Sequence, residues 1–168
     1  VNFAMDLKEV YMTTWLKGKS TYFLPFNKGT EDGGKGNPHN EDDFNVSYMW
    51  EDILKKDTVI ELIDKFIFVQ LKKEEDEKTG KIKYKETLIF PRYHQLKCLR
   101  NVLEHVKSNK SSQNYLIQHS AGSGKTNTIA WLSHRLSSLH DYNEEQIFNN
   151  IIIITDRIVV DRQLQDAV

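Results

Sequence analysis

The sequence predicts an α/β fold in two parts, an α+β segment with antiparallel strands followed by a domain with a parallel sheet. Short aromatic and β-branched runs in residues 1–90 indicate strands joined by turns, whereas apolar runs and helical patterns alternate from residue 91 onward. The charge also changes near Pro91, because 14 Lys against 17 acids precede it and 9 basic residues against 7 acids lie from it onward. We therefore expect separate domains at residues 1–90 and 91–168.

The first part opens with three strand-like runs, at residues 2–5, 9–16 and 20–26, with Gly18-Lys19 as a turn signal. Four of the chain's eight glycines then fall within residues 28–40, a composition that predicts a loop. A second phosphate site at residues 33–36 is an alternative interpretation, but no apolar strand enters these residues and no helix follows at once. We favour a mobile surface loop.

Two short helices and a hairpin are expected next. The helices are predicted at residues 48–54 and 58–66, and Thr58 and Glu61 have capping-box spacing at the start of the second. Residues 66–71 and 81–90 are expected to form the hairpin, with a turn at Thr79-Gly80 and a solvated charged tip at residues 72–78. Three side chains of its second strand should alternate toward the interior, namely Ile82, Tyr84 and Leu88.

The second part alternates helix and strand, as a parallel sheet requires. Apolar runs predict buried strands at residues 115–118 and 151–154, and a further helix is expected to begin at residues 159–164. Two helices are predicted by apolar residues at helical spacing, Leu96, Leu99, Leu103 and Val106 in the first and Ile129, Leu132, Leu136 and Leu139 in the second. Trp131 and Leu132 are expected in the core.

The run Gly122-Ser-Gly-Lys-Thr126 joins the strand at 115–118 to the second of these helices. Gly122 and Gly124 lack side chains, so the backbone can wrap a phosphate closely, and the following helix presents the positive end of its dipole there. Lys125 would reach the β- and γ-phosphates, and the Thr126 hydroxyl would hold Mg²⁺. The pattern predicts a nucleotide site that includes Ser123, within the start of a RecA-like domain.

One departure bears on the class of nucleotide-binding protein. The general pattern has Gly where this chain has His119, a substitution that superfamily 2 helicases and translocases tolerate better than GTPases do. A GTPase should also carry Asp-x-x-Gly and Asn-Lys-x-Asp, and neither occurs. The simplest alternative is a chance strand-to-helix turn, but the strand and helix context is the one that confirmation requires.

Composition indicates a soluble, cytoplasmic chain. A net charge of −1 gives no overall electrostatic footprint for nucleic acid, so any DNA contact must be local. Cys98 is the only cysteine, which excludes a disulfide within the chain and favours a reducing compartment. We expect neither a signal peptide nor a membrane span, because the start lacks a basic and long apolar segment and no apolar run approaches ~20 residues.

Several ordered motifs carry a family resemblance. Phe90-Pro-Arg-Tyr-His-Gln95, the loop ending at Thr126, and Thr155-Asp-Arg157 with Asp161-Arg-Gln-Leu-Gln165 resemble the opening motor motifs of the restriction (R) subunit of type I restriction enzymes. Tyr11-Met-Thr-Thr14, Phe23-Leu-Pro-Phe-Asn-Lys-Gly29 and Gly36-Asn-Pro38 are similar to the region just before that motor. By this resemblance, residues 1–90 are the C-terminal part of the nuclease region with a connector. Residues 91–168 are the N-terminal part of the first RecA-like motor domain, so the chain is truncated at both ends.

The resemblance implies an ATP-driven, Mg²⁺-dependent, DNA-translocating and DNA-cleaving subunit that acts on double-stranded DNA with methylation and specificity subunits. Gln95 corresponds to the glutamine that reads adenine in superfamily 2 motors, since an amide can donate and accept at the adenine edge. Arg157, Arg162 and Gln163 would lie beside the DNA backbone. Asp156 then belongs to the motor's Ia motif, although an acid after an apolar strand is also the pattern of a Walker B aspartate.

Some catalytic groups are not expected on this chain. No Asp-Glu pair follows a later strand, and no second motor domain supplies an arginine finger, so hydrolysis by this chain alone should be negligible. Neither Asp6-Leu-Lys8 nor Asp76-Glu-Lys78 is assigned to a nuclease site. Two alternatives stay open, another P-loop ATPase or helicase, and an inert connector between nuclease and motor.

Overall fold

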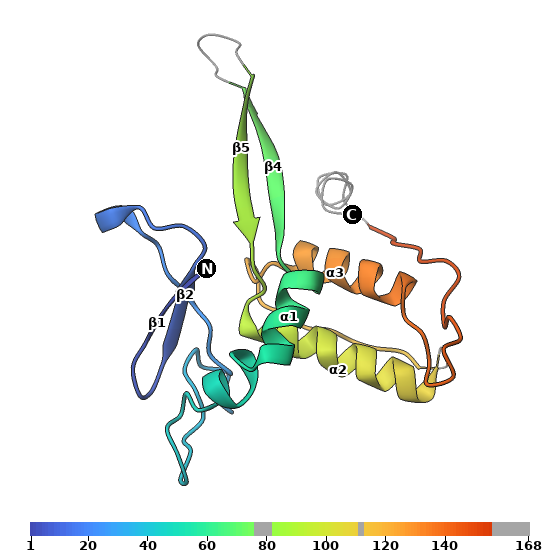
Figure 1. Cartoon of the computed structure of the whole chain (residues 1–168), viewed down its shortest axis with the longest axis horizontal. Helices are drawn as coiled ribbons and strands as arrows, with labels where there is room; N and C mark the ends of the chain where they lie inside the picture. Colours follow the sequence, from blue (N-terminus) through green and yellow to red (C-terminus); the bar gives the residue numbers. More distant parts are fainter. Residues whose placement is uncertain (76–81, 111–112, 156–168) are drawn as a thin grey trace. The chain divides into compact units, whose positions relative to one another are not determined.

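The computed structural model describes residues 1–75, 82–110 and 113–155, and it divides the chain into two compact units, Val1–His94 and Gln95–Val168 (Figure 1). The mixed α/β content with antiparallel strands agrees with the coarser part of the expected fold class, and the described residues contain no parallel sheet. Among the described helices, none has the length and apolar character needed to cross a membrane.

The first unit begins with an antiparallel sheet of three short strands in the order β1 (Asn2–Met5), β2 (Val10–Thr13) and β3 (Leu24–Pro25). The β1–β2 turn is held by the Asp6 carboxylate, which accepts the backbone N–H groups of Lys8 at 2.7 Å and Glu9 at 2.8 Å. The three predicted strands are confirmed, the first at its predicted bounds and the other two shortened. The third starts late because residues 18–20 form a short 3₁₀ turn, η1 (Gly18–Ser20).

Aromatic rings form the core of this unit. The buried Phe26 ring lies 5.4 Å from Phe3, 6.0 Å from Phe90 and 5.8 Å from Tyr93, measured between ring centroids. Tyr48 donates its hydroxyl hydrogen to the Phe26 carbonyl at 2.7 Å. Ring packing and one buried hydrogen bond therefore join β1, the end of β3 and the helical segment that follows.

The two predicted short helices are present as a π-helical turn, η2 (Met49–Ile53), and an α-helix, α1 (Lys56–Lys65). The expected capping box is wrong. Lys55 is the N-cap and makes no side-chain capping bond, so Thr58 lies within the helix. Its hydroxyl instead donates to Asp52 Oδ1 at 3.2 Å, which links α1 back to η2.

The predicted hairpin is confirmed as β4 (Phe68–Glu75) and β5 (Ile82–Ile89), and the expected turn lies outside the described residues. The first strand is longer than predicted, because residues 72–75, expected in the charged tip, pair with β5. The register pairs Val69 with Leu88, which places Val69, Ile82, Tyr84 and Leu88 on one face of the ribbon. The expectation that this face points into the core is wrong. Ile82 is 49% exposed and Tyr84 69% exposed, because alternation in a two-stranded ribbon specifies a shared face but not a layer that covers it.

The glycine-rich loop at residues 28–40 is attached to β2 by two asparagines. Asn27 Oδ1 accepts the Val10 N–H at 2.8 Å, and Asn37 Nδ2 donates to the Lys8 carbonyl at 2.9 Å and to Asn27 Oδ1 at 3.0 Å. Within the loop, Gly29 N–H donates to the Gly36 carbonyl. The backbone of this loop thus hydrogen-bonds to itself.

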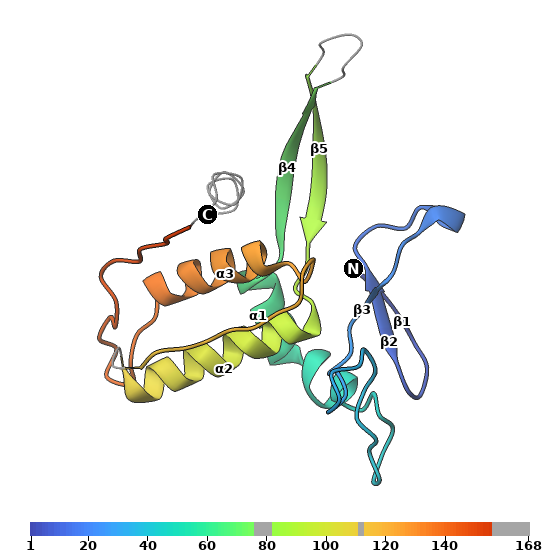
Figure 2. The same ribbon diagram turned by 180° about the vertical axis from the view of Figure 1, so that it is seen from behind.

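Most of α2 (Tyr93–Asn109), from Gln95 onward, belongs to the second unit, where it runs beside α3 (Lys125–Ser137), and the segment that joins them passes along α2 (Figures 1 and 2). Among the described residues of this unit, six apolar side chains are buried, Leu96, Leu99, Val102, Val106, Ala130 and Trp131. Trp131 therefore lies in the core as expected. Ile129 is 37% exposed, contrary to expectation, because Thr128 and Ala130 lie on the buried side of α3 instead.

The two strands predicted for a parallel sheet do not form in the described residues. Residues 115–118 and 151–154 carry no strand hydrogen bonds, and Leu116 and Ile154 are 92% and 91% exposed. An apolar run becomes a strand only with a hydrogen-bonded neighbour, and the described part of the chain gives these two segments none. The first is held differently, because the Tyr115 hydroxyl lies 2.8 Å from His105 Nδ1 of α2.

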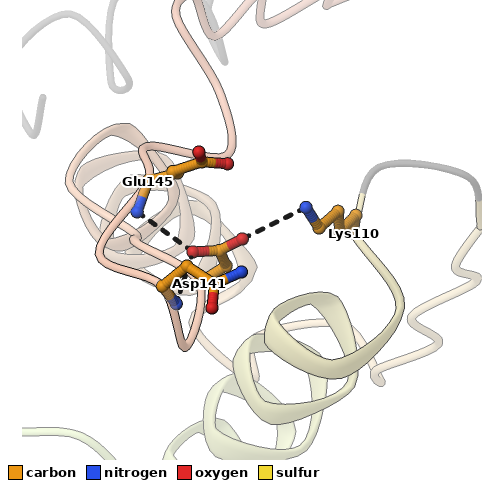
Figure 3. Close-up of polar contacts among 4 residues, drawn as sticks. Lys110, Asp141 and Glu145 are labelled. Carbon is orange, nitrogen blue, oxygen red and sulfur yellow. Dashed lines mark hydrogen bonds and ion pairs between the residues drawn. The ribbon is translucent and has the colours of Figure 1, made fainter.

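An acidic clasp attaches the segment after α3 to the end of α2 (Figure 3). Asp141 is 7% exposed, and its Oδ1 accepts the backbone N–H groups of Asn143 at 2.8 Å and Glu145 at 3.0 Å. Its Oδ2 lies 3.1 Å from the Lys110 ammonium, which completes the clasp. These hydrogen bonds lower the pKa of the Asp141 carboxyl, chiefly the one from Glu145, with Lys110 adding to the effect.

Candidate phosphate-binding site

The backbone of the glycine-rich loop before α3 has the conformation that only glycine adopts easily. Gly122 has a φ of +72° and Gly124 a φ of +83°, both in the left-handed region. Gly124 is the N-cap of α3, and no side-chain hydrogen bond caps the helix. Since the first N–H groups of an α-helix have no partner within it, the N-terminal turn of α3 offers donors to an anion.

Lys125 supplies the positive charge of this site. Its ammonium group donates to the carbonyls of Ser120 at 2.9 Å and His119 at 3.2 Å, so the side chain folds back over the loop that precedes it. No acidic residue lies in the first turn of α3 or anywhere in residues 119–128. The local charge is therefore positive, and it is reinforced by the helix dipole.

Gln95 of α2 lies behind the loop and is almost fully buried, at 3% exposure. Its Nε2 donates to the Gly124 carbonyl at 2.9 Å and to Thr128 Oγ1 at 3.2 Å. A Cβ atom on Gly124 would lie only 2.7 Å from that nitrogen, so the contact leaves no room for a side chain at position 124. The upstream glutamine and the loop thus form one site, from residues 29 positions apart.

His119 stands where the general pattern has its first glycine. Burial lowers the pKa of its imidazole, and the positive charge of Lys125 lowers this pKa further. The neutral form is therefore favoured in the folded chain. A protonated ring here would add a second positive charge close to the lysine ammonium.

The structure brings the predicted nucleotide residues together around one loop. Ser123 is buried, and Thr126 is partly buried in the first turn of α3. The predicted DNA contacts Arg157, Arg162 and Gln163, together with Asp156, lie outside the described residues. Among the residues that are described, no group of three or more His, Cys, Asp or Glu side chains is arranged to hold a metal ion.

Thr128 is the one site residue that sequence reasoning missed. It is 3% exposed, and its hydroxyl accepts from Gln95 and lies 3.4 Å from the Gly124 carbonyl. Its spacing could have identified it from the sequence, since a polar residue four positions after the N-cap glycine lies one helical turn from that glycine.

The arrangement is suited to binding a multiply charged anion. Glycine backbone with positive φ, the N–H groups of the first turn of α3 and one lysine can together surround phosphate oxygens. Thr126 adds a hydroxyl of the kind that coordinates Mg²⁺ beside a phosphate.

Two comparisons with known proteins gave matches. Residues 88–168 match the family model described as "Type III restriction enzyme, res subunit". The chain is 28% identical over 146 residues to a Methanocaldococcus jannaschii protein named "Putative type I restriction enzyme MjaVIIIP endonuclease subunit", over 79% of this chain and 13% of that protein. The chain thus spans a small part of the relative's length. No solved structure matches it. Together, the two matches show that the chain is similar to restriction enzyme subunits, with the family match in its second half.

Proposed function

We propose that the loop at residues 119–126 binds the triphosphate of ATP with Mg²⁺, as the nucleotide site of a DNA-translocating restriction subunit. The observation that carries the proposal is the joint geometry of Gly124 and Lys125. Gly124 is the N-cap of α3 and places no side chain over the first turn, and the Lys125 ammonium group lies over the same loop. In this proposal, residues 91–168 belong to a RecA-like domain, which the order of apolar segment, loop and helix supports.

The residues fit the ligand by charge and donor type. Lys125 would meet the β- and γ-phosphate oxygens in place of the carbonyls that it contacts here. The N–H groups of the first turn of α3 would donate to the remaining phosphate oxygens, and Thr126 would provide one ligand to Mg²⁺. When bound, Mg²⁺ neutralises phosphate charge; the chain's own contribution is to bind and orient the polyphosphate.

The activity that we propose for the whole protein is based on the two matches with known proteins. The helicase-like match and the type I relative support ATP-driven movement along double-stranded DNA, coupled to cleavage and to methylation and specificity subunits. Arg157, Arg162 and Gln163 remain proposed DNA contacts. A cytoplasmic location is likewise part of this proposal.

Calorimetric titration of the chain with Mg²⁺-ATP tests the proposed function. We expect a single site in the unmodified chain and no measurable heat of binding in Lys125→Ala. Lys97→Ala is the matched control, because Lys97 is an exposed lysine of α2 in the same unit and should leave the affinity unchanged. Equal affinity in the unmodified chain and in Lys125→Ala would overturn the proposal.

A further inference from the structure

The hydrogen bonds of Gln95 suggest a role distinct from reading a base. The amide nitrogen of Gln95 donates to two acceptors in this structure, the Gly124 carbonyl and Thr128 Oγ1. To donate to the edge of an adenine, the side chain would have to give up one of these bonds. Because Gln95 is only 3% exposed, its side chain would also have to leave a buried position.

The contact with Gly124 controls the direction of one peptide group. The peptide unit is planar and trans, so the Gly124 carbonyl and the Lys125 N–H point in opposite directions. Gln95 holds the carbonyl on the α2 side of the loop. The N–H of Lys125 is thereby directed away from α2, as the first donor of α3.

The contact with Thr128 holds the same turn at a second point. The Thr128 N–H donates to the Gly124 carbonyl at 3.2 Å as the first bond of the helix, and its hydroxyl lies 3.4 Å from the same oxygen. Gln95 bonds to both of these groups, Gly124 O and Thr128 Oγ1. It therefore fixes the N-cap glycine relative to the first turn of α3.

We propose that Gln95 is a positioning residue for the phosphate loop, which it holds in its binding conformation through Gly124 and Thr128, so that its effect falls on the triphosphate whatever the base. This inference rests on the proposed nucleotide site and names how that site is kept in shape. In this inference, Gln95 acts through Gly124 and Thr128 and not through contact with the base, since its burial and its hydrogen bonds both direct the amide at the loop.

The test uses ligands with and without a base. Affinities for Mg²⁺-ATP, Mg²⁺-GTP and inorganic tripolyphosphate with Mg²⁺ are measured by calorimetry in the unmodified chain, in Gln95→Ala and in Gln95→Glu, which keeps the size but loses the N–H₂ group. We expect the affinity for all three ligands to fall by a similar factor in both variants. This factor should be about tenfold, the effect of one to two lost hydrogen bonds. Gln113→Ala, an exposed glutamine of the same unit, is the control.

Thr128 provides a second test, because Gln95 is proposed to hold the loop partly through its hydrogen bond to the Thr128 hydroxyl. Thr128→Val removes the hydroxyl at nearly constant volume and should weaken tripolyphosphate binding, whereas Thr128→Ser should restore it. In Gln95→Ala the Thr128→Val change should have little further effect, since the two act through one bond. Additive losses in the double variant would count against the inference.

Hydrogen exchange in the ligand-free chain separates this inference from the proposed function. Gln95→Ala should speed exchange at the backbone amides of residues 124–128 relative to Gln113→Ala. If the unmodified chain bound no polyphosphate but exchange still rose, the proposed function would fail while the positioning role held. Loss of ATP affinity alone, with unchanged tripolyphosphate affinity and exchange, would show base reading and overturn the inference.

Discussion

The ammonium group of Lys125 lies 2.9 Å from the carbonyl oxygen of Ser120, so the cation of the candidate site is bound by the backbone of its own loop. A carbonyl oxygen is a weaker partner for an ammonium group than a phosphate oxygen is, because it carries only a partial charge. A polyphosphate can therefore displace both the Ser120 carbonyl and that of His119 at small cost. In the proposed nucleotide complex, phosphate oxygens would thus replace these two neutral acceptors.

Alanine at the two loop glycines should have unequal effects. Gly122→Ala places a Cβ in open space and should cost only the penalty of a left-handed residue, about 1 kcal/mol of unfolding free energy. Gly124→Ala adds a contact of 2.7 Å with Gln95 Nε2 and should cost more. Denaturant unfolding measures both. In a Gln95→Ala background the difference should shrink, and an unchanged difference would show that the contact is not its cause.

The stability of the chain should fall on acidification partly because of His119. Burial and Lys125 lower the pKa of its imidazole below the usual 6.5, so the folded state takes up its proton less readily than the unfolded state does. Stability from this residue is thus present above about pH 6.5 and is lost as pH falls toward the lowered pKa. His119→Gln should flatten this part of the pH profile of the melting temperature. Identical profiles for the two proteins would contradict the prediction.

The sequence predicted local structure well where the signal is local. The loop glycines, α3 and the strands of the hairpin follow from turn residues and periodicity, and all appear in the structure. The exposed face around Tyr84 was not predictable, because alternation does not reveal whether another layer covers it. Likewise the unpaired residues 115–118 and 151–154 show that an apolar run specifies strand potential but not its partner.

The candidate site was predictable in its residues but not in their contacts. The motif identifies Lys125 and Gly124, and resemblance alone identified Gln95. That the Gln95 amide bonds to Gly124 and Thr128 depends on where the start of α2 lies relative to the start of α3, a tertiary relationship that no local pattern encodes. The fold-back of Lys125 onto Ser120 is equally beyond spacing rules.

Tyr48→Phe should lower the free energy of unfolding of the first unit at neutral pH. It should also reduce the further loss of stability at alkaline pH. The variant leaves the Phe26 carbonyl without its 2.7 Å donor, at a cost of about 1–3 kcal/mol for a buried acceptor. Burial raises the pKa of Tyr48 to about 12, so the folded state resists ionisation that the unfolded state undergoes near pH 10. Stability is therefore lost as pH rises above about 10, and the variant lacks this component. Urea midpoints at about pH 7, 9 and 11 measure both effects, and a steeper alkaline loss in the variant would refute the second.

Replacing Asp141 should destabilise the second unit in two steps that match its two kinds of partner. Asp141→Asn removes the charge paired with Lys110 but keeps an oxygen that can accept the N–H groups of Asn143 and Glu145, whereas Asp141→Ala loses both. The melting temperature should thus fall further for alanine than for asparagine. Because the folded pKa of this carboxyl is lowered, its stabilisation is present above the usual value of 3.8 and is lost as pH falls through the lowered pKa. The gap between the unmodified chain and Asp141→Asn should therefore persist at about pH 5 and close only in stronger acid. A gap that closed between about pH 7 and 5 would assign the effect to a histidine instead.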